Sequence, residues 1–307
     1  MADSKKFIEF QEHVGKIKHL RRTGWVVRQV PKAETVAAHS WRMALMAIYK
    51  EKELREIGAD ANHIIEMCLL HDVGESVVGD IVPEIHQTGN KKISDKRKSQ
   101  IEGEAINSLA EKYDFPKLKT SFEEYEAQGT LEAKVVKNID KLDMLLQAYE
   151  YIVAYPYLKR LDEFMTFNEK AVDLPLFSVE LQEIKLRQSE NKQRKNKFID
   201  DSILAGLSKH QLYNPTGADI SDYDTIAAHL FRTALMAVYL GYDIDMIKSI
   251  VSNSSDEQII SELAMLENIQ QAYEYTKLYP DVKCLKSYIQ QNKNKVIIPS
   301  LRKLIAE

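Results

Sequence analysis

The chain of 307 residues is 44% hydrophobic and 29% charged, with a formal net charge of −4. This composition is ordinary for a soluble globular protein, and the slight acidity argues against general nucleic-acid binding, which needs a basic surface. No stretch approaches the roughly 18 consecutive apolar residues of a membrane span, and the N-terminal MADSKKFIEF lacks an apolar signal-peptide region. The two cysteines, Cys68 and Cys284, are too few for a disulfide scaffold. We therefore expect a cytoplasmic protein that binds neither nucleic acid nor membrane.

Apolar residues recur at helical spacing through most of the chain, and Gly and Pro are scarce, at 11 and 8 residues. Thr35 is expected to cap one helix, and Asp60 or Asn62 the next. Residues 80–83 are expected to form a loop. No run of alternating β-branched residues indicates a sheet. The predicted fold class is therefore all-α, with helices over residues 36–50, 62–72, 95–113 and 130–154.

A histidine and an aspartate, His71 and Asp72, stand side by side at the end of an apolar run in LLHDVGE, residues 69–75. Two ionisable groups in such a place are unfavourable unless a partner compensates them, and a divalent cation is a common partner. A single His-Asp pair is weak evidence, because a helix-end histidine beside a solvated aspartate is a frequent structural arrangement. The pair therefore points to a metal site only if further ligands exist elsewhere.

Two further candidate ligands, His39 and Asp140, lie on two other predicted helices with apolar flanks. Each by itself has a structural explanation, as a satisfied buried histidine or as an ion-paired aspartate. Asp143 shares a helix face with Asp140 and is interpreted as a salt-bridging neighbour. Together, two imidazoles and two carboxylates suit Mn²⁺, Co²⁺, Fe²⁺, Ni²⁺ or Zn²⁺ better than Ca²⁺. The joint pattern predicts a divalent metal site formed by His39, His71, Asp72 and Asp140.

The order H…HD…D and its flanking segments resemble the HD-domain metal-dependent phosphohydrolases, and in particular their 5′-deoxynucleotidase branch. The resemblance covers about residues 15–155, roughly half of the chain. It rests on four segments: RTGWVVRQV (22–30), ETVAAHSWRMALMA (34–47), LLHDVGESVVGDIVP (69–83) and EAKVVKNIDKLDMLLQAYEY (132–151).

The resemblance implies a 5′-nucleotidase that acts on (deoxy)ribonucleoside 5′-monophosphates, with a metal-activated water attacking the phosphate. It implies an acid/base role for Glu75 and a role in catalysis and sugar recognition for Asp80. Arg22 and Trp25 match the substrate-binding stretch, although Thr23 and Gly24 separate them here and the family pattern has them adjacent. Trp25 is equally well explained as a core residue. Glu102 matches a helix position near the family site, with a salt bridge as the alternative.

The second half of the chain repeats parts of the first. TIAAHLFRTALMAVY (225–239) repeats TVAAHSWRMALMAIY (35–49), and QQAYEYTKLYP (270–280) repeats LQAYEYIVAYP (146–156). We therefore predict an internal duplication. The metal ligands are not repeated, however. His229 corresponds to His39, whereas His71, Asp72 and Asp140 fall on Asn253, Ser254 and Ala264.

These comparisons predict a catalytic HD-domain helical bundle over residues 1–165, connecting helices over 166–200, and a shorter degenerate HD-like helical repeat over 201–307, without a metal site. The charged run at 185–197 is interpreted as a solvated helix or linker. The second half is expected to pack on the first and to cover the surface that a second subunit would otherwise contact. The expected state is a monomer with an intrachain pseudo-dimer, and a homo-oligomer is left open.

Two alternative functions remain at the level of the sequence. One is a dNTP triphosphohydrolase, and the other is a nucleotide-binding regulatory protein. The sequence close to the His-Asp pair shows no evident basic cluster for three phosphates, which weakly favours monophosphates. The intact ligand set argues against a purely regulatory protein.

Overall fold

The computed structural model describes residues 3–82, 92–158, 161, 165, 169–190, 196–220, 223–254 and 257–305. Pro83, together with residues 191–195 of the charged run and residues 255–256 of the second half, lies outside the described residues. The all-α prediction is confirmed, and the described residues add one short two-stranded sheet.

The first half comprises one long series of helices. They are α1 (Ser4–Gly15), η1 (Lys16–Lys18), α2 (Thr23–Val26), α3 (Val36–Tyr49), α4 (Glu51–Glu56), α5 (Ala61–Leu70), α6 (Glu75–Val78), α7 (Asp95–Lys112), α8 (Pro116–Ala127) and α9 (Leu131–Ala154).

The remaining elements follow in the second half and in its connection to the first. They are η3 (Glu169–Ala171), η4 (Pro175–Phe177), α11 (Ser178–Glu190), α12 (Lys197–Gly206), η5 (Leu207–Lys209), β1 (Leu212–Tyr213), β2 (Asp224–Thr225), α13 (Ile226–Leu240), α14 (Ile244–Val251), α15 (Gln258–Leu278), α16 (Lys283–Lys293), α17 (Pro299–Arg302) and η6 (Lys303–Ile305).

The predicted helices form where their caps place them. The Thr35 hydroxyl accepts a hydrogen bond from the Ala38 amide and begins α3. Asp60, and not Asn62, caps α5, because its carboxylate accepts from the amides of Asn62 and His63. Such caps satisfy amides that have no partner inside the helix. The two caps fix where the helices that carry His39 and His71 begin.

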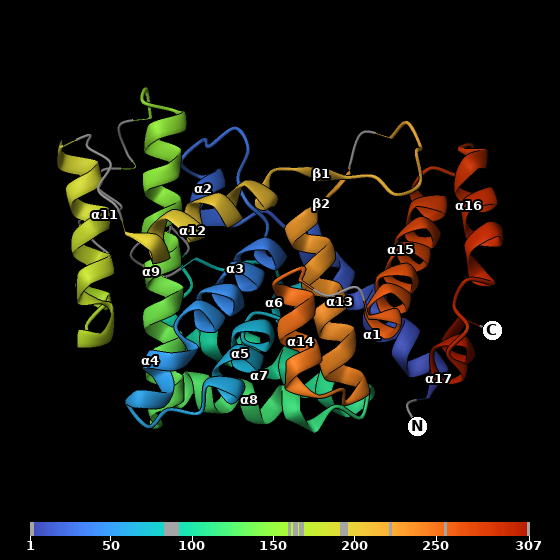
Figure 1. The fold of residues 1–307 in the computed structure, drawn as a ribbon, viewed down its shortest axis with the longest axis horizontal. Helices are drawn as coiled ribbons and strands as arrows, with labels where there is room; N and C mark the ends of the chain where they lie inside the picture. The colour runs from blue at the N-terminus through green and yellow to red at the C-terminus, as the bar shows by residue number, and fades with distance from the viewer. Residues whose placement is uncertain are drawn as a thin grey trace.

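Helix α3 lies at the centre of the molecule and is buried on nearly all sides, with 12 of its 14 residues buried. It packs against α5, α9, α12 and α13 (Figure 1). Helix α13, which carries the repeated sequence, is buried to a similar extent and contacts α3 directly. The Trp41 indole donates a hydrogen bond to the Val251 carbonyl at 3.0 Å, which ties α3 to the end of α14. One continuous cluster of buried apolar side chains therefore runs through both halves.

The short sheet departs from the helical prediction, and so does the turn after α5 that holds His71 and Asp72, the last residues of the predicted helix 62–72. Strands β1 and β2 pair antiparallel, with Leu212 opposite Thr225. The first half has an isolated bridge between Arg21 and Thr35 in the corresponding place. Strands of two residues are too short to show an alternating pattern in the sequence. In both halves, this pairing fixes the residue that caps the central helix.

The helix that begins each half reaches into the other half. Helix α1 lies beside α13 and α15, whereas α12 lies against α3 and α9, so that the dark blue helix α1 and the yellow helix α12 of Figure 1 each contact elements of the opposite half. Each ends in a glycine and a short 3-10 turn that carries a lysine, Lys18 in η1 and Lys209 in η5. Both lysine side chains are fully buried.

The terminal glycines allow this close approach. A Cβ atom on Gly206 would lie 2.5 Å from Nη1 of Arg42 and 2.7 Å from Oε1 of Glu150. A Cβ atom on Gly15 would lie 2.6 Å from Nη1 of Arg232. Both arginines are buried and ion-paired, so they have little freedom to move away. Glycine is therefore required at both helix ends.

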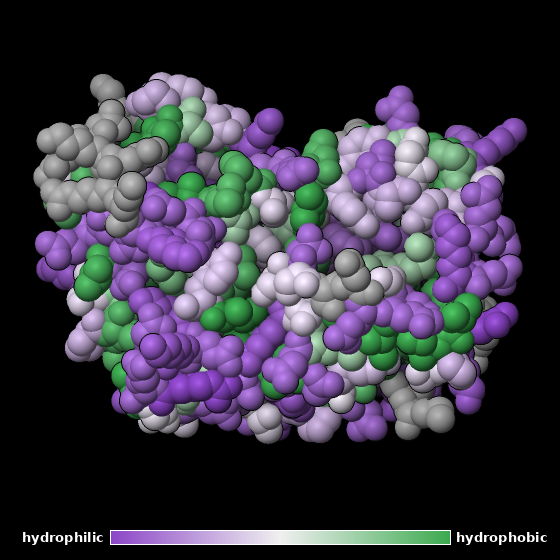
Figure 2. Space-filling view, in the orientation of Figure 1, coloured by the Kyte–Doolittle hydropathy of each residue, from purple (hydrophilic) through white to green (hydrophobic). Residues whose placement is uncertain are grey.

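The outer surface is mixed in character. On the face drawn in Figure 2, hydrophilic residues predominate at the lower left, and hydrophobic residues form separate small groups. Among the described helices, none combines the length and the apolar character that crossing a membrane requires.

We expect Gly206→Ala to lower the free energy of unfolding by roughly 1–3 kcal/mol, because the added methyl group overpacks the buried Arg42–Glu150 pair. Gly15→Ala should have a similar effect through Arg232. Gly129→Ala is the control, since its Cβ atom would meet nothing within 4 Å. Chemical denaturation of the three variants tests this, and equal stability of Gly206→Ala and Gly129→Ala would contradict it.

Candidate active site

Three helices bring the predicted ligands together. His39 lies in the first turn of α3, His71 and Asp72 follow the end of α5, and Asp140 lies in the middle of α9. His39, His71 and Asp72 offer ligand atoms that all lie within 4.8 Å of one another. Oδ1 of Asp140 is 3.4 Å from Nε2 of His39. The fold therefore gathers all four residues at one place.

The two imidazoles are oriented by contacts at their Nδ1 atoms. Nδ1 of His39 is 2.6 Å from Oδ2 of Asp143, and Nδ1 of His71 is 2.9 Å from the Cys68 carbonyl oxygen. Both partners are acceptors, so each Nδ1 carries the hydrogen and each Nε2 offers a lone pair. The two Nε2 atoms are buried, with no hydrogen-bond partner among the described residues. Two such nitrogens beside two carboxylates fit a divalent metal ion.

The charges at this place also suit a cation. Burial by itself raises the pKa of Asp140, but Lys141, His39 and Lys137 hold it well below its ordinary value. Burial likewise opposes ionisation of Asp72, and the neighbouring His71 reverses the effect and lowers the pKa. Both carboxylates are thus ionised near neutral pH.

The pKa of His39 reflects the same surroundings. Burial and the nearby Arg22 lower it, but the neighbouring carboxylates of Asp140 and Asp143 outweigh them, and the pKa is raised. A proton and a metal ion therefore compete for the same Nε2 atom.

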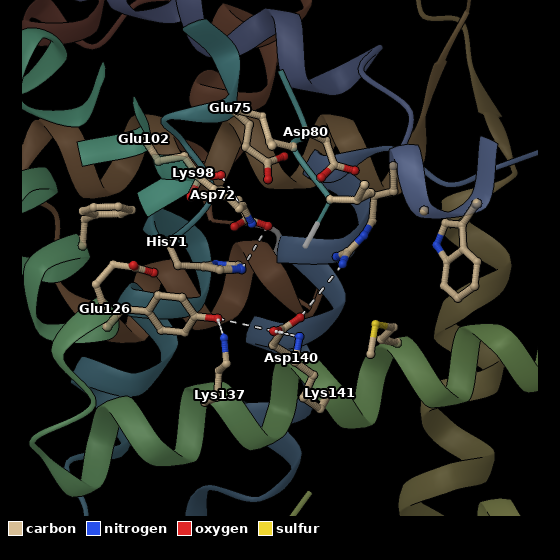
Figure 3. Close-up of a pocket in the computed structure, with 18 of the residues that line it drawn as sticks. His71, Asp72, Glu75, Asp80, Lys98, Glu102, Glu126, Lys137, Asp140 and Lys141 are labelled. Atoms are coloured by element: carbon tan, nitrogen blue, oxygen red, sulfur yellow. Dashed lines mark hydrogen bonds and ion pairs between the residues drawn. The ribbon is translucent and has the colours of Figure 1, made fainter. Parts of the chain in front are cut away.

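A cavity of about 150 Å³ adjoins the cluster. Figure 3 shows Lys137 and Lys141 on α9 flanking Asp140, with His71 and Asp72 across the cavity and Lys98 nearby on α7. The prediction that no basic cluster lies near the motif is therefore wrong. The cations that line the cavity come from elements far apart in the sequence: Arg22, Lys98, Lys137 and Lys141.

Arg22 lines the cavity and is partly buried. Its Nη2 is 4.0 Å from Oδ1 of Asp140, and its Nη1 has no hydrogen-bond partner among the described residues. Such an orphaned guanidinium donor fits an anionic ligand that enters the cavity.

Two glutamates of the cavity are held in poorly solvated positions. Glu75 begins α6, and its Oε2 is buried without a hydrogen-bond partner among the described residues. Burial raises the pKa of Glu75 well above its ordinary value, and the charges of Asp72 and Asp80 raise it further. Glu102 is 3.4 Å from Nζ of Lys98, and burial raises its pKa to about 7 despite that contact. Both groups retain protons more readily than ordinary carboxyl groups.

Asp80 and Trp25 support the stretch that carries Arg22. Oδ2 of Asp80 accepts a hydrogen bond from the Thr23 amide at 2.5 Å, and the Asp80 carbonyl accepts from the Thr23 hydroxyl at 2.8 Å. Trp25 is only 1% exposed, and its indole donates to Oε1 of Glu34 at 3.0 Å. Trp25 thus lines the cavity as a core residue, with little open surface for stacking.

Residues 14–174 match the family model described as HD domain, which is more than half of the chain. The chain belongs to the HD domain family. HD domains bind divalent metal ions, and this one has a potential His/Asp metal site in the arrangement described above.

About half of the chain is similar to known proteins. A 5′-deoxynucleotidase HDDC2 of Xenopus laevis is 39% identical over 153 residues, which are 48% of this chain and 70% of the relative. The HDDC2 of Dictyostelium discoideum is 40% identical over 153 residues, 47% of this chain and 77% of the relative. A solved conserved hypothetical protein of Pyrococcus furiosus is 31% identical and covers 58% of this chain and 98% of its own, with a TM-score of 0.49.

Sequence reasoning missed the three lysines and the contact between Asp143 and His39. The sequence could have indicated that Lys137 and Lys141 lie at the site, because they are three residues before and one residue after Asp140 on the same helix. The sequence could not have indicated this for Lys98, since α7 is far from the motif in the sequence. Asp143 forms salt bridges, as interpreted, and in addition it holds an imidazole of the HD domain cluster.

We expect Asp72→Ala to lose stoichiometric metal while keeping its helical content, because removing one of four ligands weakens binding steeply. Metal content by mass spectrometry and far-ultraviolet circular dichroism measure the two effects. Glu104→Ala, which removes an exposed carboxylate, is the control. Full metal occupancy in Asp72→Ala would show that the ion is bound elsewhere.

Proposed function

We propose that this HD domain protein is a divalent-metal-dependent 5′-nucleotidase that releases phosphate from (deoxy)ribonucleoside 5′-monophosphates. The observation that carries the proposal is the pair of buried Nε2 atoms, which lie 3.4 Å from the carboxylate of Asp140 and 3.1 Å from that of Asp72, beside a cavity lined by cations. The relatives named 5′-deoxynucleotidase support the same reaction.

His39, His71, Asp72 and Asp140 would hold the metal. Their mixed nitrogen and oxygen donors suit Mn²⁺, Co²⁺, Fe²⁺, Ni²⁺ or Zn²⁺. When bound, such an ion polarises a phosphoryl oxygen and makes water a stronger nucleophile at neutral pH. No serine or cysteine nucleophile is then required.

The cations of the cavity would bind the phosphate. Nη1 of Arg22 has no hydrogen-bond partner in the described part of the chain, and Lys98, Lys137 and Lys141 line the same cavity. Charge-assisted hydrogen bonds from these groups neutralise a dianion and orient its phosphorus toward the cluster.

Glu75 would act as the general acid that protonates the leaving group. Its buried Oε2 faces no protein donor among the described residues, and its raised pKa favours the protonated acid. A protonated Oε2 can donate to the departing 5′-oxygen of the nucleoside, which otherwise leaves as an alkoxide.

Asp80 would act on the substrate in two ways. Its Oδ2 fixes the Thr23 amide and hence the position of Arg22. The carboxylate also lines the cavity, where it can accept hydrogen bonds from the sugar. Trp25 and Met144 contribute apolar wall beside it, which fits a nucleoside.

The two alternatives predict different products. The cationic cavity is compatible with a longer phosphate chain, so charge does not exclude a triphosphohydrolase, whereas the named relatives favour monophosphates. A regulatory nucleotide-binding protein would need no metal cluster. A cytoplasmic location remains part of the proposal, and the two unpaired cysteines fit a reducing compartment.

A panel of ribo- and deoxyribonucleoside mono- and triphosphates tests the reaction. We expect inorganic phosphate release from monophosphates with Mn²⁺ or Co²⁺, loss of release with a chelator, and recovery on adding metal. Inorganic triphosphate release from dNTPs would replace the proposal with its first alternative. Nucleotide binding without turnover in any metal would replace it with the second.

Glu75→Gln should retain metal but lower kcat by roughly 10²–10⁴-fold, because the amide cannot donate the proton that a positioned acid supplies. Steady-state kinetics and metal analysis on the same sample separate the two effects. Loss of metal instead would make Glu75 a ligand or a support for one.

A further inference from the structure

Lys209 belongs to the second half, yet its side chain ends inside the first. It is 1% exposed. Its ammonium lies 3.3 Å from Oδ1 and 3.2 Å from Oδ2 of Asp143, and 3.1 Å from Oε1 of Gln147. It also donates to Oε2 of Glu34. Lys209 is therefore a buried cation shared by two carboxylates of the first half.

These carboxylates connect Lys209 to both sides of the candidate active site. Oδ2 of Asp143 contacts Nδ1 of His39 at 2.6 Å, which leaves Nε2 of that ring turned toward Asp140 and the metal position. Oε1 of Glu34 accepts from the Trp25 indole at the wall of the cavity. One ammonium thus fixes the partners of a metal ligand and of a cavity residue.

Glu34, His39 and Asp143 by themselves have the spacing of a second cation site, with ligand atoms within 4.8 Å of one another. The Lys209 ammonium is already bonded to both carboxylates there. It therefore takes the place of a cation, and the carboxylates stay aligned without a second metal ion.

We propose that Lys209 is a positioning residue for the metal centre, supplied by the second half of the chain. The inference rests on the proposed metal role of His39. Lys209 holds Asp143, Asp143 holds Nδ1 of His39, and Nε2 is thereby aimed at the metal. Hydrogen-bonded partners of this kind typically account for about 10–100-fold in metal affinity.

The second half contains an equivalent network, in which Lys18 takes the place of Lys209; we call it the mirror network. Lys18, from the first half, pairs with Asp224 and Glu267. Glu267 in turn contacts Nδ1 of His229 and Nε of Arg232. Lys18 and Lys209 thus have matching burial, matching partners and matching places at the ends of α1 and α12.

No metal cluster adjoins the mirror network in the part of the chain that the structure describes. Ala264 occupies the place of Asp140, and the described residues directly after α14, Ser252, Asn253 and Ser254, include no histidine or aspartate. Substituting Lys18 therefore shows what a buried lysine contributes to the packing of the two halves, separately from any contribution to a metal site.

The test compares Lys209→Met with Lys18→Met in the full chain. Both variants leave buried carboxylates short of a partner, so both should unfold at lower denaturant concentration than the wild type. Titration with Mn²⁺ by calorimetry should show affinity about 10–100-fold weaker in Lys209→Met, and within roughly twofold of wild type in Lys18→Met. Equal affinity in Lys209→Met and wild type, or equal weakening in both variants, would falsify the positioning role.

A spectroscopic readout distinguishes positioning from general loosening. In protein labelled with ¹⁵N-histidine and saturated with Zn²⁺, the His39 Nδ1–H resonance is assigned by its loss in His39→Gln. We expect faster solvent exchange and an upfield shift of this proton in Lys209→Met but not in Lys18→Met. An unchanged resonance in Lys209→Met would overturn the proposal.

If the single variants do not fold, two double variants keep the comparison open. Lys209→Met with Glu34→Gln, and Lys18→Met with Asp224→Asn, each remove one lysine and one of its carboxylates, and the same two measurements apply. Wild-type protein that binds Mn²⁺ but releases no phosphate would refute the nucleotidase and leave the Lys209 comparison valid.

Discussion

The carboxylate of Asp143 is the interaction on which the rest of the structure depends. It is fully buried and contacts Arg42 of α3, Lys209 of η5 and the His39 imidazole. A buried carboxylate is unfavourable unless its partners are close and well aligned, and here two cations and a ring nitrogen meet that condition. Burial raises its pKa, but Arg42 and Lys209 hold it well below the ordinary value.

One buried charge therefore couples three features of the molecule. Arg42 extends the network to Glu150 at 2.7 Å and joins α3 to α9. Gly206 lets α12 approach that pair closely, and Lys209 follows three residues later. The docking of the second half and the orientation of a candidate metal ligand are consequently properties of the same cluster.

Local features of the sequence predicted much of this structure. Thr35 and Asp60 mark the beginnings of two helices because capping depends on neighbouring residues alone. The four candidate ligands stand out because two of them are adjacent and the others sit in apolar helices. The contact between Lys209 and Asp143 spans 66 residues, and no periodicity shows which element a polar helix face will meet. Lys98 escaped notice for the same reason, since it reaches the cavity from α7, which is far from the motif in the sequence.

The placement of α1 bears on the order in which the chain is synthesised. Lys18, just after α1, is made 249 residues before its partner Glu267. Phe10 of α1 stacks on Tyr239, with the ring centroids 4.9 Å apart, and Tyr239 is also made late. Contacts this distant in sequence form slowly, so the contacts of α1 with α13 and α15 form only after those helices have been made. Helix α1 thus reaches its final contacts long after it is synthesised, and a nascent chain that stops before α15 lacks the Glu267 carboxylate that pairs with Lys18.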